Sequence, residues 1–187
     1  MPRQHERPND ALLAYAALPV VAGAVMLSLL GAVLLAGCNP EEYVIATIDP
    51  TAGNSATGEV RFYPVESGVR VVASISGLAP GKHGFHLHEK GDCSAPDAAS
   101  AGGHYNPLGA PHGSPDGNRA TRHVGDLGNI DADAGGKSTY DRVDSLLVYA
   151  DLAGLAVLVH GKEDDLTSQP AGNAGARIGC GVIRKRE

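Results

Sequence analysis

The sequence predicts an all-β fold in which eight short strands form a β-sandwich or flattened barrel and two long loops carry the function. Its 25 glycines and 12 prolines, with no tryptophan and 4% aromatic residues, favour many tight turns over helices. Apolar and polar residues alternate with a period of two along much of the chain. No stretch after Gly37 sustains an apolar period of 3.6 residues. Many short strands separated by turn signals are typical of sandwiches and barrels.

The eight predicted strands are short runs, several of which alternate clearly and are bounded by Gly or Pro. In chain order they cover residues 43–48, 58–63, 69–75, 83–88, 122–130, 145–149, 156–160 and 177–183. Two segments break this pattern, residues 91–121 and residues 161–175, and both are rich in Gly, Ala and Asp. Long loops without regular structure are uncommon in a compact domain and are usually functional.

The N-terminus has the parts of a secretory signal. Arg3 and Arg7 precede an uncharged apolar run over residues 11–37, which closes on the sequence LAGC ending at Cys38. LAGC resembles the bacterial lipobox, in which the cysteine is lipidated and becomes the first residue after cleavage. Two alternatives stay open: an uncleaved signal anchor, since the run could span a bilayer, and a plain signal peptide with a chance LAGC.

The expected organisation is therefore a lipoprotein-type signal peptide over residues 1–37, a lipidated Cys38 with a short tether to residue 42, and a β domain over residues 43–187. The mature protein would be exported and anchored to a membrane on the periplasmic or cell-surface side. Nothing beyond the N-terminal run is apolar enough to cross a membrane. The formal net charge of -6 argues against nucleic acid as a partner, and a homodimer is left open.

With Cys38 assigned to the lipid, Cys93 and Cys180 remain as an even pair. An exported chain meets an oxidising compartment, where two remaining cysteines usually form a disulfide. The alternative is a pair of free buried thiols.

Histidine supplies the main functional signal. Two of these residues, His86 and His88, are one residue apart, so on a strand their imidazoles share one face. Imidazole nitrogens suit Cu(II) and Zn(II), and three imidazoles with one carboxylate suit zinc. The alternative for any single member is a surface or loop histidine without a metal, but seven candidates in four clusters favour a two-metal site: His86, His88, His104, His112, His123, Asp126 and His160.

Four longer motifs contain these residues. They read GFHLHEKGDC, SAGGHYNP, RHVGDLGNIDAD and GNAGARIGCGVI, and together they resemble the Cu/Zn superoxide dismutase family over roughly residues 58–183. The resemblance implies an eight-stranded Greek-key β-barrel that binds one copper and one zinc per chain. It further implies that His104 bridges the two ions. The implied copper ligands are His86, His88, His104 and His160, and the implied zinc ligands are His104, His112, His123 and Asp126.

The same resemblance assigns roles to residues outside the two ligand sets. Asp164 would be the carboxylate linking His86 to His112, Arg177 would be the active-site arginine, and Cys93 with Cys180 would be the family disulfide. The implied activity is dismutation of superoxide, protecting the cell envelope. The main alternative is a non-catalytic envelope lipoprotein that stores or carries copper and zinc.

Two departures from the eukaryotic family members are visible in the sequence. The loop between Gly161 and Arg177 is shorter, which puts in doubt the charged residues that guide the anion there. Cys93 also follows Asp92 directly, where eukaryotic members have a few residues between them. The local shape of the disulfide loop is therefore less certain than the pairing.

Overall fold

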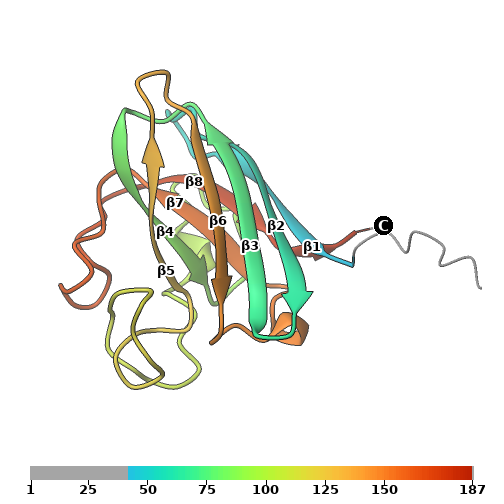
Figure 1. The fold of residues 1–187 in the computed structure, drawn as a ribbon. Helices are drawn as coiled ribbons and strands as arrows, with labels where there is room; N and C mark the ends of the chain where they lie inside the picture. The colour runs from blue at the N-terminus through green and yellow to red at the C-terminus, as the bar shows by residue number, and fades with distance from the viewer. Residues whose placement is uncertain (1–41, 187) are drawn as a thin grey trace, which may run out of the picture. The chain divides into compact units, whose positions relative to one another are not determined.

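The computed structural model describes residues 42–186 and is all-β, as predicted (Figure 1). Besides the strands, the described residues contain two 3₁₀ turns, η1 over Ala99–Ala101 and η2 over Tyr149–Asp151. No helix in residues 42–186 has the length and apolar character to span a bilayer. The strands are β1 Val44–Pro50, β2 Thr57–Val65, β3 Gly68–Ser76, β4 Gly81–His88, β5 Asp126–Ala132, β6 Ser138–Asp144, β7 Ala156–His160, β8 Arg177–Val182 and the two-residue β9 Arg184–Lys185.

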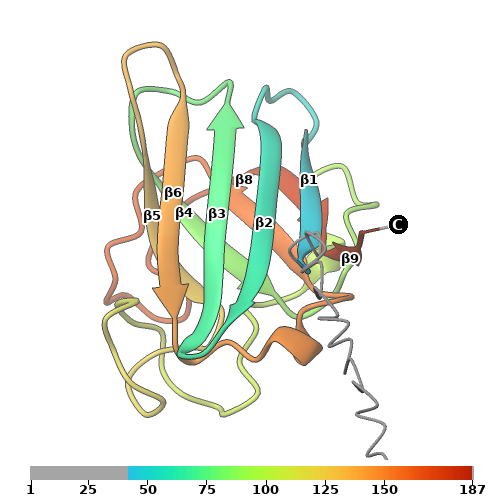
Figure 2. The same ribbon diagram turned by 45° about the vertical axis from the view of Figure 1, so that its right-hand side comes forward.

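The strands form a nearly closed antiparallel barrel with the order β5-β4-β7-β8-β1-β2-β3-β6, and β9 pairs with β1. Figure 2 shows β6, β3, β2 and β1 as one layer in front of β4 and β8. The fourth strand crosses over to lie between β5 and β7, and β6 lies beside β3. These are Greek-key connections, and they bring β4, β5 and β7 together on one side of the barrel.

The core follows from the alternation of residues along the strands. In β3, Val69, Val71, Ala73 and Ile75 are buried. All five residues of β7 and the last six of β4 are buried, because these strands are covered on both faces. The two phenylalanines, Phe62 and Phe85, are fully buried. The side chains of β4 and β7 therefore lie in a dry environment, which sets the conditions for any polar residue on them.

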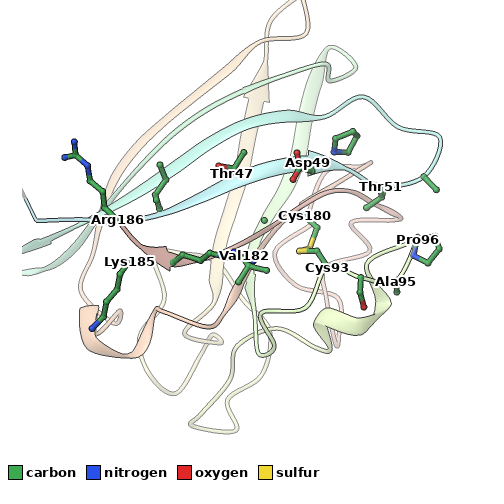
Figure 3. Close-up of a pocket in the computed structure, with 16 residues that line it drawn as sticks. Thr47, Asp49, Thr51, Cys93, Ala95, Pro96, Cys180, Val182, Lys185 and Arg186 are labelled. Carbon is green, nitrogen blue, oxygen red and sulfur yellow. A yellow bond between two sulfur atoms is a disulfide. The ribbon is translucent and has the colours of Figure 1, made fainter.

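The disulfide between Cys93 and Cys180 is present and ties the long loop after β4 to β8. Beside it, β1 pairs with β8 only at its end, where Asp49 faces Cys180, and with β9 at its start. A groove of about 680 Å³ lies along this split, with the disulfide in its wall (Figure 3). None of the seven metal-ligand candidates lines the groove, so it is separate from the histidine cluster.

One predicted strand is wrong, and two observed strands, β6 and the two-residue β9, were not predicted. Residues 145–148 form a loop and Tyr149 begins η2, and the sixth strand is instead Ser138–Asp144, paired with β3 along its length. Its sequence, STYDRVD, contains few apolar residues because much of its length is exposed at the surface. A prediction based on apolar runs therefore selected the neighbouring segment SLLVY.

The fifth strand also begins later than predicted, at Asp126 and not at Arg122. The reason is that Arg122, only 2% exposed, turns inward and organises the preceding loop. Its Nη1 donates to the carbonyls of His123, Val124 and Asp126, and its Nη2 donates to both carboxylate oxygens of Asp144 at 2.6 and 2.7 Å. A buried ion pair is stable only when its remaining donors are satisfied, which these carbonyls achieve.

Replacing Asp144 with alanine should lower the free energy of unfolding by about 3–5 kcal/mol, because the buried guanidinium of Arg122 then lacks its counter-ion. Asp141→Ala is the matched control, since Asp141 also accepts two hydrogen bonds from an arginine, Arg70, but on the surface. The control should leave the free energy nearly unchanged. Urea unfolding of metal-free protein measures both, and equal losses would contradict the importance of burial.

Candidate metal centre

The seven candidate ligands converge on one side of the barrel. His86 and His88 lie on β4, Asp126 begins β5 and His160 ends β7, so the neighbouring strands place these four residues together. The other three, His104, His112 and His123, belong to the loop between β4 and β5. That loop is fixed to β4 by backbone hydrogen bonds of Leu87 with Tyr105 and Gly125. All seven side chains are buried.

The candidates form two groups that share His104. In each group the potential ligand atoms lie within 4.8 Å of one another. The first group contains His86, His88, His104 and His160, and the second contains His104, His112, His123 and Asp126. The ring centroids of His86 and His104 are 4.1 Å apart, so the rings are in contact. The structure thus brings together the residues of each ligand set that the resemblance implied.

Four buried ring nitrogens in the first group have no hydrogen-bond partner: His86 Nδ1, His88 Nε2, His104 Nε2 and His160 Nε2. In each ring the other nitrogen is held. His88 Nδ1 donates to the carbonyl of Gly102 at 2.9 Å, and His160 Nδ1 to that of Gly175 at 3.2 Å. A held N–H fixes the tautomer, so each unpaired nitrogen presents a lone pair. Unpaired buried polar atoms cost stability, and a soft or borderline cation among four imidazoles removes that cost.

The second group is built around one carboxylate oxygen. Asp126 Oδ1 lies 2.8 Å from His104 Nδ1, 3.0 Å from His112 Nδ1 and 3.1 Å from His123 Nδ1. The other oxygen, Oδ2, accepts the backbone N–H groups of Gly113 and His123, which orient the carboxylate. Three imidazole nitrogens and one carboxylate oxygen form a ligand set suited to tetrahedral zinc. The residues therefore fit a zinc ion here.

Burial controls the charge of three rings in the first group. It lowers the pKa of His86 to about 4, of His160 to about 3 and of His88 to about 2. These rings are neutral at physiological pH, and the neutral ring is the form that binds a metal.

His112 behaves in the opposite way because it lies between two carboxylates. Burial works against its charged form, but hydrogen bonds to Asp126 and Asp164 outweigh burial and raise the pKa of His112 to about 9. Burial likewise favours neutral forms of both aspartates, yet the histidine hydrogen bonds hold the pKa of each carboxyl well below its usual range. The two carboxylates thus stay charged. Their negative charge favours a nearby cation, and a metal ion bound at His112 Nδ1 would be one.

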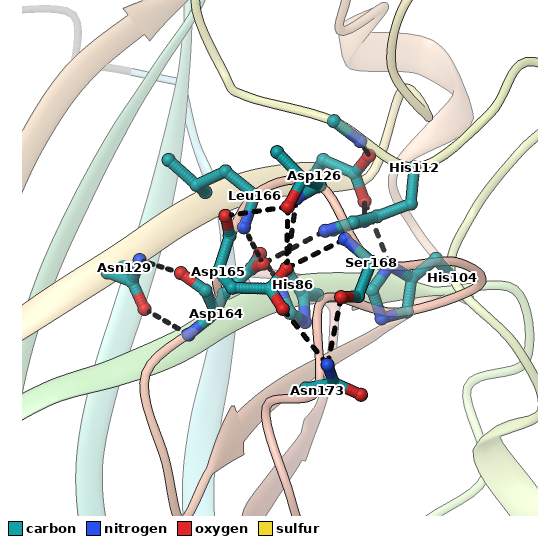
Figure 4. Close-up of polar contacts among 12 residues, drawn as sticks. His86, His104, His112, Asp126, Asn129, Asp164, Asp165, Leu166, Ser168 and Asn173 are labelled. Atoms are coloured by element: carbon teal, nitrogen blue, oxygen red, sulfur yellow. Dashed lines mark hydrogen bonds and ion pairs between the residues drawn. The ribbon is translucent and has the colours of Figure 1, made fainter.

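The carboxylate of Asp164 contacts one histidine of each group (Figure 4). Its Oδ2 accepts a hydrogen bond from His86 Nε2 at 2.8 Å, and its Oδ1 accepts one from His112 Nε2 at 2.9 Å. The main chain of Asp164 is held in turn by Asn129 of β5, whose amide donates to its carbonyl and accepts from its N–H. One carboxylate therefore orients a ring of each group, and the barrel wall orients that carboxylate.

Arg177, at the start of β8, lies close to the first group. Its Nη1 donates to the carbonyl of Ala98 and its Nη2 to the carbonyl of Gly102, both at 2.6 Å. The carbonyl of Gly102 also accepts from His88, so the arginine and a candidate ligand share one anchor. The guanidinium is partly buried and keeps its charge at neutral pH.

The sequence missed three residues that organise the site: Arg122, Asn129 and Gln169. Asn129 and Gln169 bind backbone groups of residues far along the chain, whereas Arg122 binds carbonyls one to four residues after it. Contacts to backbone groups leave no periodic or spacing signal in the sequence. His83 lies against the carbonyls of His160 and Ala79 at 2.7 and 2.8 Å. It belongs to neither ligand group in the described residues.

Comparison with known proteins identifies the family of this chain. The model of the copper/zinc superoxide dismutase family matches residues 56–183, more than half of the chain. The chain is similar to a Cu-Zn superoxide dismutase of Paramecium bursaria Chlorella virus 1, with 47% identity over 136 residues covering 67% of this chain and 71% of the relative. It is also similar to an extracellular Cu-Zn superoxide dismutase of Caenorhabditis elegans, with 45% identity over 67% of this chain and 60% of the relative.

A relative with a different name matches as well. The copper chaperone for superoxide dismutase of Mus musculus is 41% identical over 138 residues, which cover 70% of this chain and 49% of the chaperone. Among solved structures, the clock protein EA4 superposes with a TM-score of 0.68 at 40% identity, covering 77% of this chain and 94% of that chain.

Asp164→Asn should weaken metal binding at both groups by about 10- to 100-fold, because an amide cannot accept hydrogen bonds from His86 and His112 with both of its atoms. Asp165→Asn is the matched control: this neighbouring carboxylate is exposed and accepts hydrogen bonds only from its own loop among the described residues. Competition with chelators of known affinity measures the change for each metal. Equal affinities in Asp164→Asn and wild type would remove the orienting role of Asp164.

Proposed function

The chain belongs to the copper/zinc superoxide dismutase family, and we propose that it catalyses the dismutation of superoxide at the two histidine groups. Family membership implies copper and zinc as cofactors, and the two ligand groups provide places for two metals. In the proposed reaction two superoxide anions and two protons give dioxygen and hydrogen peroxide. Copper supplies the redox change that the two half-reactions need, which zinc cannot supply.

We assign one copper per chain to the all-histidine group and one zinc to the group containing Asp126. Four imidazoles suit copper, and three imidazoles with a carboxylate suit zinc. The assignment is supported by the tautomers, because the held nitrogens leave the four unpaired ones facing the first group.

The observation that carries the proposal is the position of His104. It offers Nδ1 to the second group and the unpaired Nε2 to the first, so one ring connects both groups. A ring held at Nδ1 can take up a proton at Nε2 and release it there without leaving its place. The second half-reaction consumes protons, and His104 Nε2 is the atom at which we propose that one is stored and delivered.

Arg177 is the proposed binding group for the anionic substrate. The protein has a formal net charge of -6, which on average repels superoxide. Local charge in a confined site outweighs the distant net charge, and Arg177 is a fixed cation beside the first group. Its position is supported by the two carbonyls it contacts and by the nearby bridge from Cys180 to Cys93, which joins β8 to the loop containing both carbonyls.

We further propose that the chain is exported and anchored through Cys38, on the periplasmic or cell-surface side, where it protects the cell envelope. Residues 1–41 lie outside the described part of the chain, so the support comes from the sequence, from the disulfide and from the extracellular relative. Mass spectrometry of the mature N-terminal peptide tests this: an acylated Cys38 is expected, and an intact residue 1 or an unmodified Cys38 would refute the anchor.

A second candidate function is copper carriage or storage, which the match to a copper chaperone favours. A carrier must hold and release copper but needs neither a bridging ring nor a substrate-binding cation. This chain retains His104 with a nitrogen toward each group, Asp164 between the groups and Arg177 beside them. These features favour the enzyme.

The deciding experiment measures metal content and superoxide decay on one sample of the protein loaded with copper and zinc. One copper and one zinc per chain with rapid, near diffusion-limited decay is expected for wild type. His88→Ala should lose copper and activity and keep zinc, since His88 belongs to the first group alone. Full metal content without dismutation in the wild type would reject the enzyme and favour the copper carrier.

Arg177→Met should reduce kcat/KM for superoxide by about 10-fold or more without loss of metal, because the cation near the first group is removed. Arg177→Lys keeps the charge but not the planar guanidinium, so its kcat/KM should lie between those of wild type and Arg177→Met. Decay rates measured at several ionic strengths check this, since the wild-type rate should depend on salt more steeply than the methionine variant. Unchanged turnover in Arg177→Met would remove its assigned role.

A further inference from the structure

Gln169 makes an unusual contact between the two long loops. Its Oε1 accepts a hydrogen bond from the backbone N–H of His112 at 2.8 Å, and its Nε2 donates to the backbone carbonyl of the same residue at 2.9 Å. The second amide hydrogen reaches the carbonyl of Thr167. An exposed glutamine would ordinarily be free to rotate, but here all its polar atoms are engaged.

His112 depends on this contact for its main chain. It lies in an irregular part of the loop between β4 and β5, and within residues 42–186 the hydrogen bonds of its backbone N–H and C=O both go to Gln169. The residue is only 3% exposed. Buried backbone groups require partners, and an irregular loop does not supply them from its own chain.

The loop that contains Gln169 also holds the imidazole of His112, through Asp164. The loop between β7 and β8 thus binds His112 at two places, its main chain and its ring atom Nε2. A main-chain contact alone would leave both side-chain torsions free, and a ring contact alone would leave the backbone free to shift. The two contacts together fix Nδ1, the atom that faces Asp126 and the second group.

The loop is itself rigid enough to position a neighbour. Asn129 of β5 binds the main chain of Asp164 through the same two-bond pattern, so the loop is fixed to the barrel wall. Gly172 packs against the junction: a Cβ there would overlap Asp164 Oδ1 and lie 2.7 Å from His112 Nε2. The positive φ of 64° at Gly172 also favours glycine.

From these contacts we propose that Gln169 is a positioning residue for the metal ligand His112, acting through the backbone of that residue. The inference rests on the proposed metal-binding role of the second group. In this proposal the short loop positions His112 in the second group twice: Gln169 binds its backbone and Asp164 binds its ring. Gln169 touches neither metal nor substrate in this role.

The test uses the protein expressed from its full-length sequence, with Gln169→Met as the principal variant because methionine has a similar length and lacks the hydrogen bonds. Zinc affinity measured by chelator competition should fall about tenfold or more. Cobalt placed at the zinc site should show an altered visible spectrum, because the ligand geometry changes. Thr167→Val is the matched control: it removes a hydrogen bond within the same loop and no contact to His112, and it should change neither readout.

A merely structural role predicts a different pattern, in which Gln169→Met lowers the melting temperature of the metal-free protein while zinc affinity and the cobalt spectrum stay as in wild type. That pattern, or an equal loss of affinity in Thr167→Val, would overturn the proposal. Should the methionine variant not fold, Gln169→Glu provides the same test, since it keeps an acceptor for the N–H of His112 and loses the donor to its carbonyl. Zinc affinity does not depend on turnover, so a protein that binds zinc through Gln169-positioned His112 without dismutating superoxide would reject the proposed function alone.

Discussion

The constraint on which the rest of the structure depends is the convergence of seven buried candidate ligands, six of them imidazoles, into one dry space. Protonating an imidazole that is packed among others without water is energetically unfavourable. This desolvation penalty lowers the pKa values of His86, His88 and His160. The arrangement leaves four nitrogens without partners in the protein. Folding therefore creates a site whose unsatisfied atoms all face one point, and a metal is the natural partner for them.

The barrel supplies half of this convergence and the loops supply the other half. Strands β4, β5 and β7 are neighbours, so the placement of His86, His88, Asp126 and His160 follows from sheet topology. The three loop histidines do not lie on strands, and hydrogen bonds from side chains of their own loop and of the loop between β7 and β8 hold them in place. Arg122 binds the carbonyls around His123, Gln169 binds the backbone of His112, and Asp164 binds its ring. The loop half of the site thus depends on polar contacts, in addition to the apolar packing of residues such as Val124.

This division explains what the sequence could predict. Fold class and seven of the eight predicted strands are readable because period-two alternation leaves a local pattern, and the dense histidine motifs mark the candidate ligands. Their division into two groups came from the family resemblance of those motifs. The strand at Ser138–Asp144 was missed because its exposed, charged face hides the alternation, and the apolar residues 145–149 attracted the prediction. Asn129 and Gln169 were missed for a different reason. An amide that binds the backbone of a residue far along the chain has no local signature, although Asn129 lies inside a motif that the resemblance used.

These contacts indicate a role for the short loop between β7 and β8. In sequence this loop departs from the eukaryotic family members, because it is shorter than the loop over which they spread charged residues. In the structure several of its polar contacts go to the site: Asp164 to His86 and His112, and Gln169 to His112. Others fix the loop to the barrel, where Asn129 binds Asp164 and two residues of β4 bind Lys162 and Glu163. A short loop with several fixed points loses less conformational entropy on folding than a long one. These contacts suit the loop to holding the candidate ligands rigidly, and the proposed attraction of superoxide then rests mainly on Arg177.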